Sequence, residues 1–241
     1  MAREYLDPEV SIEPIKTQAA APPGDRFAAS LRGFGPLGLL AILIIAVSTL
    51  APFPLTPVLV LLWAKWSRTP WREIGYVRPK SWIGSCAIGI VFGGAFKLLM
   101  KALVMPLLGA DPINRAYQYL VGNKAALPGI VAAVIIGAGW GEETVYRGYL
   151  FERLGKLLGA GAAAKAAIVL VTAGLFAAAH YSGQGVAGVE QAAMTGLVFG
   201  AIFAVTGRLW MVMCAHAAFD LTALAIIYYD VEAKVAHLIF K

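Results

Sequence analysis

Residues 209–229 read LWMVMCAHAAFDLTALAIIYY, and this stretch decides the class of fold. It is long enough to cross a bilayer, because one spanning helix takes about 20 mainly apolar residues. Only His216 and Asp220 interrupt it with a charge-bearing side chain. Other apolar segments precede it, at residues 34–50, 53–66, 82–108, 127–146, 162–180 and 189–206. We therefore predict about seven transmembrane helices.

The composition agrees with this prediction. Of the 241 residues, 59% are hydrophobic and 14% are charged, and the mean hydropathy is +0.72. A soluble domain carries roughly 25% charged residues, so this chain has too little polar surface for a water-exposed globule. Disordered, collagen-like and coiled-coil chains are excluded for the same reason. The predicted class is an all-α polytopic membrane helical bundle.

The N-terminal part and the loops set the predicted organisation. Residues 1–33 are polar with charges of both signs, which predicts a disordered tail before a single membrane-embedded domain at 34–241. The net charge of +6 reflects basic loops, and these fall on the side that also holds the N-terminus. The opposite loops carry only Arg115, Lys124, Lys234 and Lys241. We expect a cytoplasmic N-terminus, membrane lipids as partners and no nucleic-acid partner.

Four residues inside apolar segments stand apart from the loops. Lys97 and Lys101 are four apart and share a helix face; Lys101 can extend to the membrane surface, whereas Lys97 lies deeper and would line a cavity or contact substrate. Cys86 and Cys214 lie in different apolar segments. We expect them to be buried free thiols.

Ionisable residues within membrane helices are costly and indicate function. Three clusters occur, at Glu142-Glu143-Thr-Val-Tyr-Arg147, at Phe176-Ala-Ala-Ala-His180 and at His216-Ala-Ala-Phe-Asp220. A spacing of four places Glu143 with Arg147, Phe176 with His180 and His216 with Asp220 on shared helix faces.

The three clusters are predicted to converge. The helix that carries Glu142 can continue to the turn at 159–161, and the returning arm to His180 has nearly the same length. At 1.5 Å per residue, Glu142 and His180 then lie within about 3 Å of the same depth. His216 follows Arg208 on the cytoplasmic half of the last helix. The predicted site lies between the fourth, fifth and seventh helices.

One carboxylate with two imidazoles suits the activation of water. A buried carboxylate can act as a general base toward water. Two histidines and a carboxylate also match the open three-ligand pattern of catalytic zinc, here Glu142, His180 and His216. Both alternatives end in hydrolysis of an acyl bond.

The three motifs, in this order and within membrane helices, resemble the CPBP family of CAAX-protease and bacteriocin-processing membrane proteases, also called ABI or Rce1-like. The stretch 71–82, Gly148 and the turn 207–210 are similar to flanking features of that family, so the resemblance covers residues 71–229, a protease-like core. It implies an intramembrane endopeptidase, of the metallo or glutamate type, that cuts a membrane-associated protein or peptide.

The resemblance also implies a role for each matched residue. Glu142 would activate water as a base or metal ligand, with help from His180. Glu143 and Arg147 would form the pair that orients the site. His216 and Asp220 would stabilise the oxyanion or complete a metal sphere, with zinc as the expected metal and a metal-free reaction as the alternative.

Asp220 stands where the eukaryotic prenyl-protease branch has asparagine, and an ionised carboxylate cannot donate to an oxyanion. This favours a metal ligand or a group that orients a histidine. It also indicates the bacterial branch, an inner-membrane location, and a substrate that need not be prenylated.

Two other classes of function fit the composition. Intramembrane Glu, His and Asp also serve proton relays and transporters, although the chain shows no inverted repeat or matched pair of broken helices. A catalytically silent membrane scaffold or immunity protein on the same fold is the other alternative.

Overall fold

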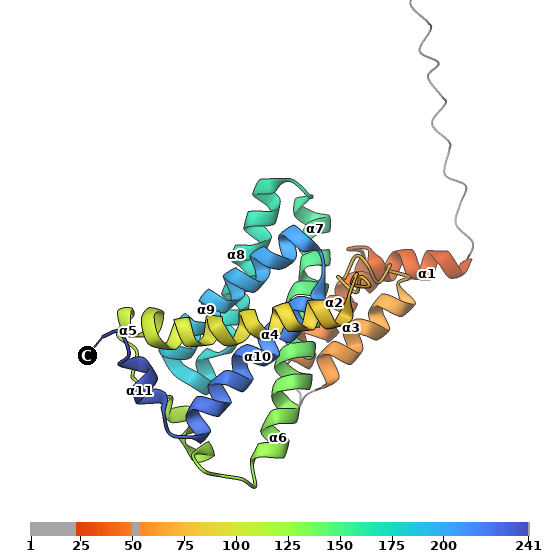
Figure 1. Ribbon diagram of the computed structural model, residues 1–241. Coiled ribbons are helices and arrows are strands. Elements are labelled where there is room, and N and C mark those ends of the chain that lie inside the picture. Colours follow the sequence, from red (N-terminus) through yellow and green to blue (C-terminus); the bar gives the residue numbers. More distant parts are fainter. Residues whose placement is uncertain (1–22, 50–53, 241) are drawn as a thin grey trace, which may run out of the picture.

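The computed structural model describes residues 23–49 and 54–240. Within these ranges every regular element is helical, which confirms the predicted all-α class (Figure 1). The elements are α1 (Pro23–Arg32), α2 (Pro36–Ser48), α3 (Leu55–Trp66), α4 (Trp82–Leu99), η1 (Met100–Val104), α5 (Met105–Leu107), η2 (Arg115–Leu120), α6 (Leu127–Ala132), η3 (Ala133–Glu142), η4 (Thr144–Tyr149), α7 (Leu150–Leu158), α8 (Ala162–Ala179), α9 (Tyr181–Thr206), α10 (Leu209–Tyr228) and α11 (Glu232–Ala236).

Four helices in the described ranges are long and apolar enough to cross a membrane. They are Trp82–Leu107, Ala162–Ala179, Tyr181–Thr206 and Leu209–Tyr228. A fifth span results if α1 and α2, which meet at 57°, are counted together. α3, with 12 residues, is shorter than a full span. Length and composition therefore support a bundle of membrane helices, but they identify four or five spans in the described residues and not the predicted seven.

The predicted tail differs from the structure in its last part. Residues 1–22 lie outside the described residues, but Pro23–Arg32 forms α1. Its aspartate in the first turn and arginine in the last turn both complement the helix dipole. The prediction of disorder is therefore wrong for residues 23–32, which form a helix.

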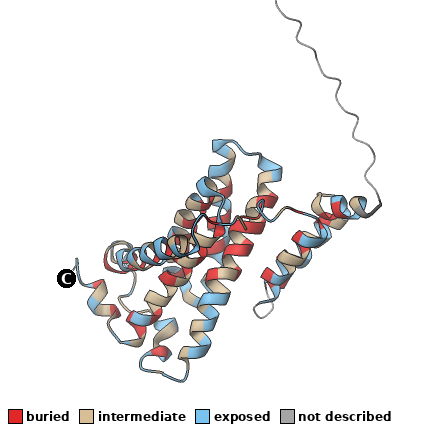
Figure 2. Ribbon diagram, turned by 45° about the vertical axis from the view of Figure 1, so that its right-hand side comes forward, coloured by how far each residue is buried: buried red, intermediate tan, exposed pale blue. Residues whose placement is uncertain are grey.

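The outer surface of the bundle is apolar. Large side chains such as those of Ile83, Val91 and Val205 are mostly exposed. Figure 2 shows the buried residues gathered in the interior and the exposed ones on the outward faces of the helices. So many exposed apolar side chains would be unfavourable in water and suit a lipid environment.

α4 and α10 form the closest helix pair. A Cβ atom at Gly93 would lie 2.0 Å from the backbone oxygen of Ala215, and one at Gly89 would lie 2.5 Å from that of Met211. Glycine at both positions is what lets the two backbones approach, as expected for small residues between membrane helices. The two helices run in the same direction, because the contacts advance together along both chains.

The helical hairpin predicted around residue 160 is present. α6, η3, η4 and α7 follow one another with right-handed helical backbone at each junction, then residues 159–161 turn the chain into α8. η3 and η4 are π-helical, with i→i+5 hydrogen bonds that widen the helix. Such widened turns often occur at functional sites. Glu142 and Glu143 lie at the junction of η3 and η4.

The segment between α3 and α4 packs into the bundle beside this junction. Gly75 has φ of +80°, a region that favours glycine, and a Cβ there would lie 2.5 Å from the Phe203 ring. The Leu209 amide donates to the Gly75 carbonyl at 3.0 Å and ties α10 to the segment. Ile74 is fully buried. The segment therefore forms part of the bundle.

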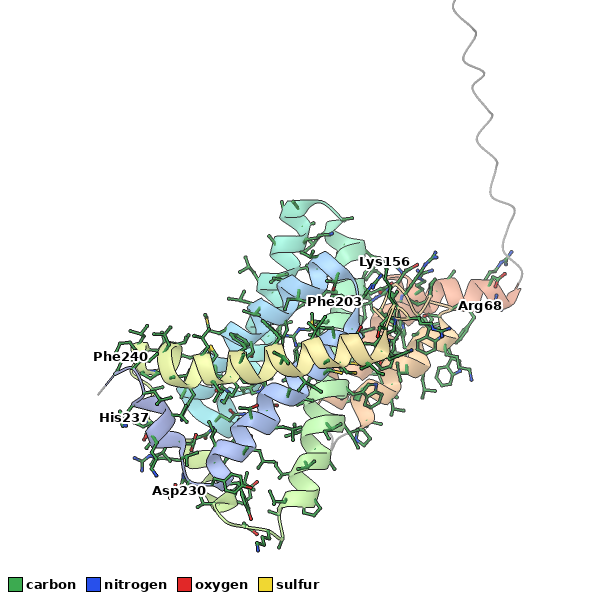
Figure 3. All side chains as sticks on the ribbon, in the orientation of Figure 1. Arg68, Lys156, Phe203, Asp230, His237 and Phe240 are labelled. Carbon is green, nitrogen blue, oxygen red and sulfur yellow. The ribbon has the colours of Figure 1, made fainter. Side chains whose placement is uncertain are left out.

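The charged loops lie at separated ends of the molecule. Figure 3 shows Arg68 and Lys156 at the upper right of the bundle and Asp230 and His237 at the lower left. This separation agrees with loops that face opposite sides of a membrane.

Candidate active site

Glu143 and Arg147 form a fully enclosed ion pair. Arg147 Nη1 donates to Glu143 Oε1 at 2.8 Å, and both side chains are at most 1% exposed. Arg147 Nη2 also donates to the Gly196 carbonyl at 3.3 Å. The guanidinium lies 4.9 Å from the centre of the Phe176 ring and 5.8 Å from that of Phe199. These contacts compensate the cost of burying a cation.

His216 on α10 contacts the same carboxylate. Its Nδ1 lies 2.6 Å from Glu143 Oε1, and the residue is 4% exposed. Since an ionised carboxylate only accepts, Nδ1 carries the proton of this hydrogen bond. In the neutral ring Nε2 is then left with a lone pair. Glu143 thus fixes the tautomer and the orientation of His216.

Two further carboxylates face the free nitrogen of His216. Nε2 lies 3.7 Å from Glu142 Oε2 and 3.7 Å from Asp220 Oδ2. Glu142 Oε2 is buried and has no hydrogen-bond partner among the described residues. A gap of this width between polar groups suits a bridging water. The predicted shared face of His216 and Asp220 is present.

His180 is held in the same manner by a different acceptor. It caps the C-terminus of α8, and its Nδ1 lies 2.8 Å from the Phe176 carbonyl oxygen. The carbonyl accepts, so Nδ1 is the protonated nitrogen and Nε2 is free. The Phe176 and His180 rings pack with centres 4.6 Å apart, as their spacing predicts.

A cavity joins the residues from the separate helices. With a volume of about 710 Å³, it is lined by Glu142, His180 and Asp220 together with mainly small and apolar residues of α3, η3 and α8. A second cavity of about 110 Å³ is lined by His180, His216 and Asp220 among others. The three predicted clusters therefore meet at one place, with Glu142 on the larger cavity.

The same residues carry the types of donor atom that bind metal ions, but these atoms are not gathered into a ready site. Over residues 23–49 and 54–240, no group of three His, Cys, Asp or Glu side chains is close enough to hold one as the side chains stand. The donor types nevertheless fit zinc, since both histidines have a free Nε2 and Glu142 Oε2 has no partner. Each histidine Nδ1 has an acceptor, which is how metal-binding histidines are usually oriented.

A ring of hydrogen bonds holds the helix beside Glu143. Trp140 Nε1 donates to the Tyr76 oxygen at 2.8 Å, and Tyr76 lies 2.7 Å from Thr144 Oγ1. Thr144 Oγ1 donates to the Trp140 carbonyl at 2.7 Å. A hydroxyl has one proton, so Tyr76 must donate to Thr144. Burial raises the pKa of Tyr76, which keeps that proton in place.

Sequence spacing alone does not assign this role to Tyr76, Trp140 or Thr144. Tyr76 lies in the stretch 71–82, which resembled a family feature, and that was the one available signal. Trp140 and Thr144 flank the two glutamates, but a hydrogen-bonded ring across two segments cannot be read from local spacing.

Comparison with known proteins found one family match. A family model described as "Type II CAAX prenyl endopeptidase Rce1-like" matches residues 124–222. No curated protein and no solved structure matches the chain. The matched range begins just before α6 and ends within α10, so it takes in all of the predicted site residues. Over residues 124–222, the chain is therefore similar to the Rce1-like family of CAAX proteases.

Proposed function

We propose that the protein is an intramembrane endopeptidase that hydrolyses a peptide bond in a membrane-associated protein, with Glu142 as the group that activates water. One observation carries the proposal. Glu142 Oε2 is buried, has no hydrogen-bond partner in the described part of the chain and lies 3.7 Å from His216 Nε2, and Glu142 lines the largest of the cavities around the site. A carboxylate in this position can take a proton from water.

The neighbouring side chains support a complete hydrolysis. Water gives a proton to Glu142, and its oxygen attacks the carbonyl carbon of the substrate. His216, as an imidazolium, donates a hydrogen bond from Nε2 to the oxyanion. Glu142 then gives its proton to the leaving nitrogen as the C–N bond breaks. Glu143 and Asp220 lie on the two sides of its ring and stabilise the imidazolium. His180 offers Nε2 as a second acceptor for the water.

A divalent metal fits the same residues. Glu142, His180 and His216 would hold zinc, which would supply Lewis-acid polarisation of the bound oxygen. Their free donor atoms support this assignment, and the metal-free reaction uses the same three residues. Metal analysis of the purified protein separates the two: one zinc per chain, lost on His216→Ala, supports the metal, whereas activity that persists in a chelator supports Glu142 alone.

The remaining features of the membrane arrangement are part of this proposal. We place the N-terminus and the basic loops in the cytoplasm of a bacterium, with the site between the helix that carries Glu142, α8 and α10. α3 and the helix of residues 127–158 would complete a bundle of about seven crossings, because their apolar faces continue the lipid-facing surface.

The test is cleavage by reconstituted protein. Wild type, Glu142→Gln and Glu190→Gln are placed in liposomes with a library of membrane peptides, and products are identified by mass spectrometry. Glu190 lies on α9 and lines none of the three cavities around the site, so it is the matched control. We expect cleavage by wild type and Glu190→Gln and a loss of roughly 100-fold or more for Glu142→Gln.

Equal cleavage by wild type and Glu142→Gln, or no cleavage by wild type, would exclude the proposal. Proton flux across the same vesicles, if abolished by Glu142→Gln, would instead indicate a relay.

A further inference from the structure

Lys97 and Lys101 lie one turn apart on neighbouring helical segments and have different environments. Lys101 Nζ lies 2.9 Å from Glu232 Oε1, so its charge is paired. Lys97 is 5% exposed, and its Nζ donates to the neutral amide oxygen of Gln191 at 2.6 Å. No described carboxylate lies within ion-pair distance of Lys97, although a buried ammonium ordinarily requires an anion.

The position of Lys97 follows from the packing of α4 on α10. One turn beyond the contact of Gly93 with Ala215, Lys97 meets Phe219, with Nζ 4.9 Å from the ring centre. Phe219 directly precedes Asp220. The close packing of α4 on α10 therefore places this cation near Asp220.

Lys97 also lies where two cavities adjoin. It lines the cavity of about 110 Å³ that reaches His180 and His216, and a second cavity of about 280 Å³ that extends toward Asp111 and Glu232. Gln191 lines both as well. The route from the reacting groups to Lys97 is bordered largely by apolar residues of η2, α6 and α10.

Gln191 completes a receptor for a carboxylate. Its Oε1 accepts from Lys97, so its amide nitrogen has to point another way and offers its protons to the cavities. An ammonium beside an amide N–H can bind the two oxygens of one carboxylate. A phosphate would need more positive charge, and Lys101 is already neutralised by Glu232.

We propose that Lys97 and Gln191 form a subsite that binds a carboxylate of the substrate on the side of the scissile bond away from the larger cavity. This assignment rests on the proposed endopeptidase function. The carboxylate comes either from the free C-terminus of the substrate or from an Asp or Glu side chain, and the segment that joins it to the scissile bond is apolar.

The test measures binding, so that it does not depend on turnover. Glu142→Gln protein in lipid nanodiscs is titrated with short apolar fluorescent peptides of one sequence. One ends in a free carboxylate, one in an amide, and two further amides carry Glu or Gln at the same internal position. Preference for the first over the second identifies the C-terminus, and preference for Glu over Gln identifies a side chain.

Three variants are compared in the Glu142→Gln background. Lys97→Met is expected to weaken binding of the preferred carboxylate peptide at least about tenfold and to leave the amide peptides unchanged. Lys97→Arg should restore the preference in large part. Gln191→Glu places a carboxylate beside Lys97 and should abolish the preference without unfolding the protein. Lys165→Met, at an exposed position on α8, is the matched control.

Equal binding of acid and amide peptides, or no binding of any, overturns the subsite. So does a Lys97→Met variant that loses thermal stability but keeps the preference, since Lys97 would then only balance the charge of Asp220. The proposed function is tested separately by cleavage in liposomes, where wild type can succeed with peptides of either kind.

Discussion

Arg147 shows at the scale of one residue how this protein holds a charge inside a membrane. Its guanidinium donates hydrogen bonds to Glu143 and to the Gly196 carbonyl. The same planar group packs on the rings of Phe176 and Phe199. Lysine, a compact point charge, could not stack on the rings and donate in this fork geometry. The sequence predicted the pair with Glu143 from the spacing of four, but the contacts with α9 depend on the tertiary fold.

Removal of the guanidinium should therefore be strongly destabilising. Arg147→Met leaves Glu143 buried beside His216 without its cation, at a cost of about 3–5 kcal/mol. The melting temperature in detergent measures this loss. The double variant Glu143→Gln/Arg147→Met should lose less than the sum of its single variants, and strictly additive losses would contradict the pairing.

Cys86 and Cys214 were predicted as buried free thiols, but the structure shows both only half-buried. They remain free, but their sulfur atoms are 2.9 Å apart where α4 crosses α10. Sequence position could not reveal this, because the register of the two helices is set by the contacts of Gly89 and Gly93 with α10.

We expect oxidised glutathione to convert the two thiols into a disulfide by exchange, with two molecules of reduced glutathione released per bond. Intact-mass measurement should show the loss of two hydrogens, absent in Cys86→Ser. Two thiols that stay open to alkylation after this treatment would argue against the contact.

At the scale of elements, the helical hairpin was predictable and its hydrogen-bond pattern was not. The run from residue 127 to the small-residue turn and back to His180 follows from apolar length and a glycine-rich turn. A π-helical turn leaves almost the same apolar pattern in the sequence as an α-helical one. Beside Glu142 and Glu143, this turn is hydrogen-bonded through Trp140 and Thr144 to Tyr76, which comes from another segment.

Loss of the hydrogen bonds that join Tyr76, Trp140 and Thr144 should lower the rate of catalysis more than it weakens substrate binding. Tyr76→Phe leaves the Trp140 indole N–H without its acceptor and frees the turn that carries Glu142. We expect kcat to fall about tenfold with KM nearly unchanged, on a substrate found in the liposome library. Tyr229→Phe, 73% exposed, is the control. A rise in KM alone would place Tyr76 in substrate binding instead.

At the scale of the molecule, buried charges join the N-terminal helix to the rest of the chain. Arg153 donates to the Arg32 carbonyl at 2.7 Å and lies 4.5 Å from the Trp63 ring centre. The Trp63 indole donates to the Leu31 carbonyl at 3.1 Å. Composition correctly placed the chain in a membrane, but it could not show that residues 23–32 dock as a helix.

Arg153→Met should release α1 while the site stays intact. Backbone amides of residues 25–33 are expected to exchange hydrogen for deuterium faster, because both the carbonyl contact and the stack on Trp63 are lost. Mass spectrometry of peptic fragments measures the rates, with Lys165→Met as control. Unchanged protection of these amides would show that α1 is held by apolar contacts alone.

A single oxygen of Glu143 accepts from both Arg147 and His216. The same atom therefore stabilises the fold through Arg147 and orients His216, which takes part in the proposed reaction. Apolar replacement of a buried ion pair often makes a protein more stable, but here it would also free the His216 ring to adopt the wrong tautomer. A substitution at Glu143 that raises thermal stability is therefore expected to lower activity. Stabilising substitutions should be made at positions other than Glu143.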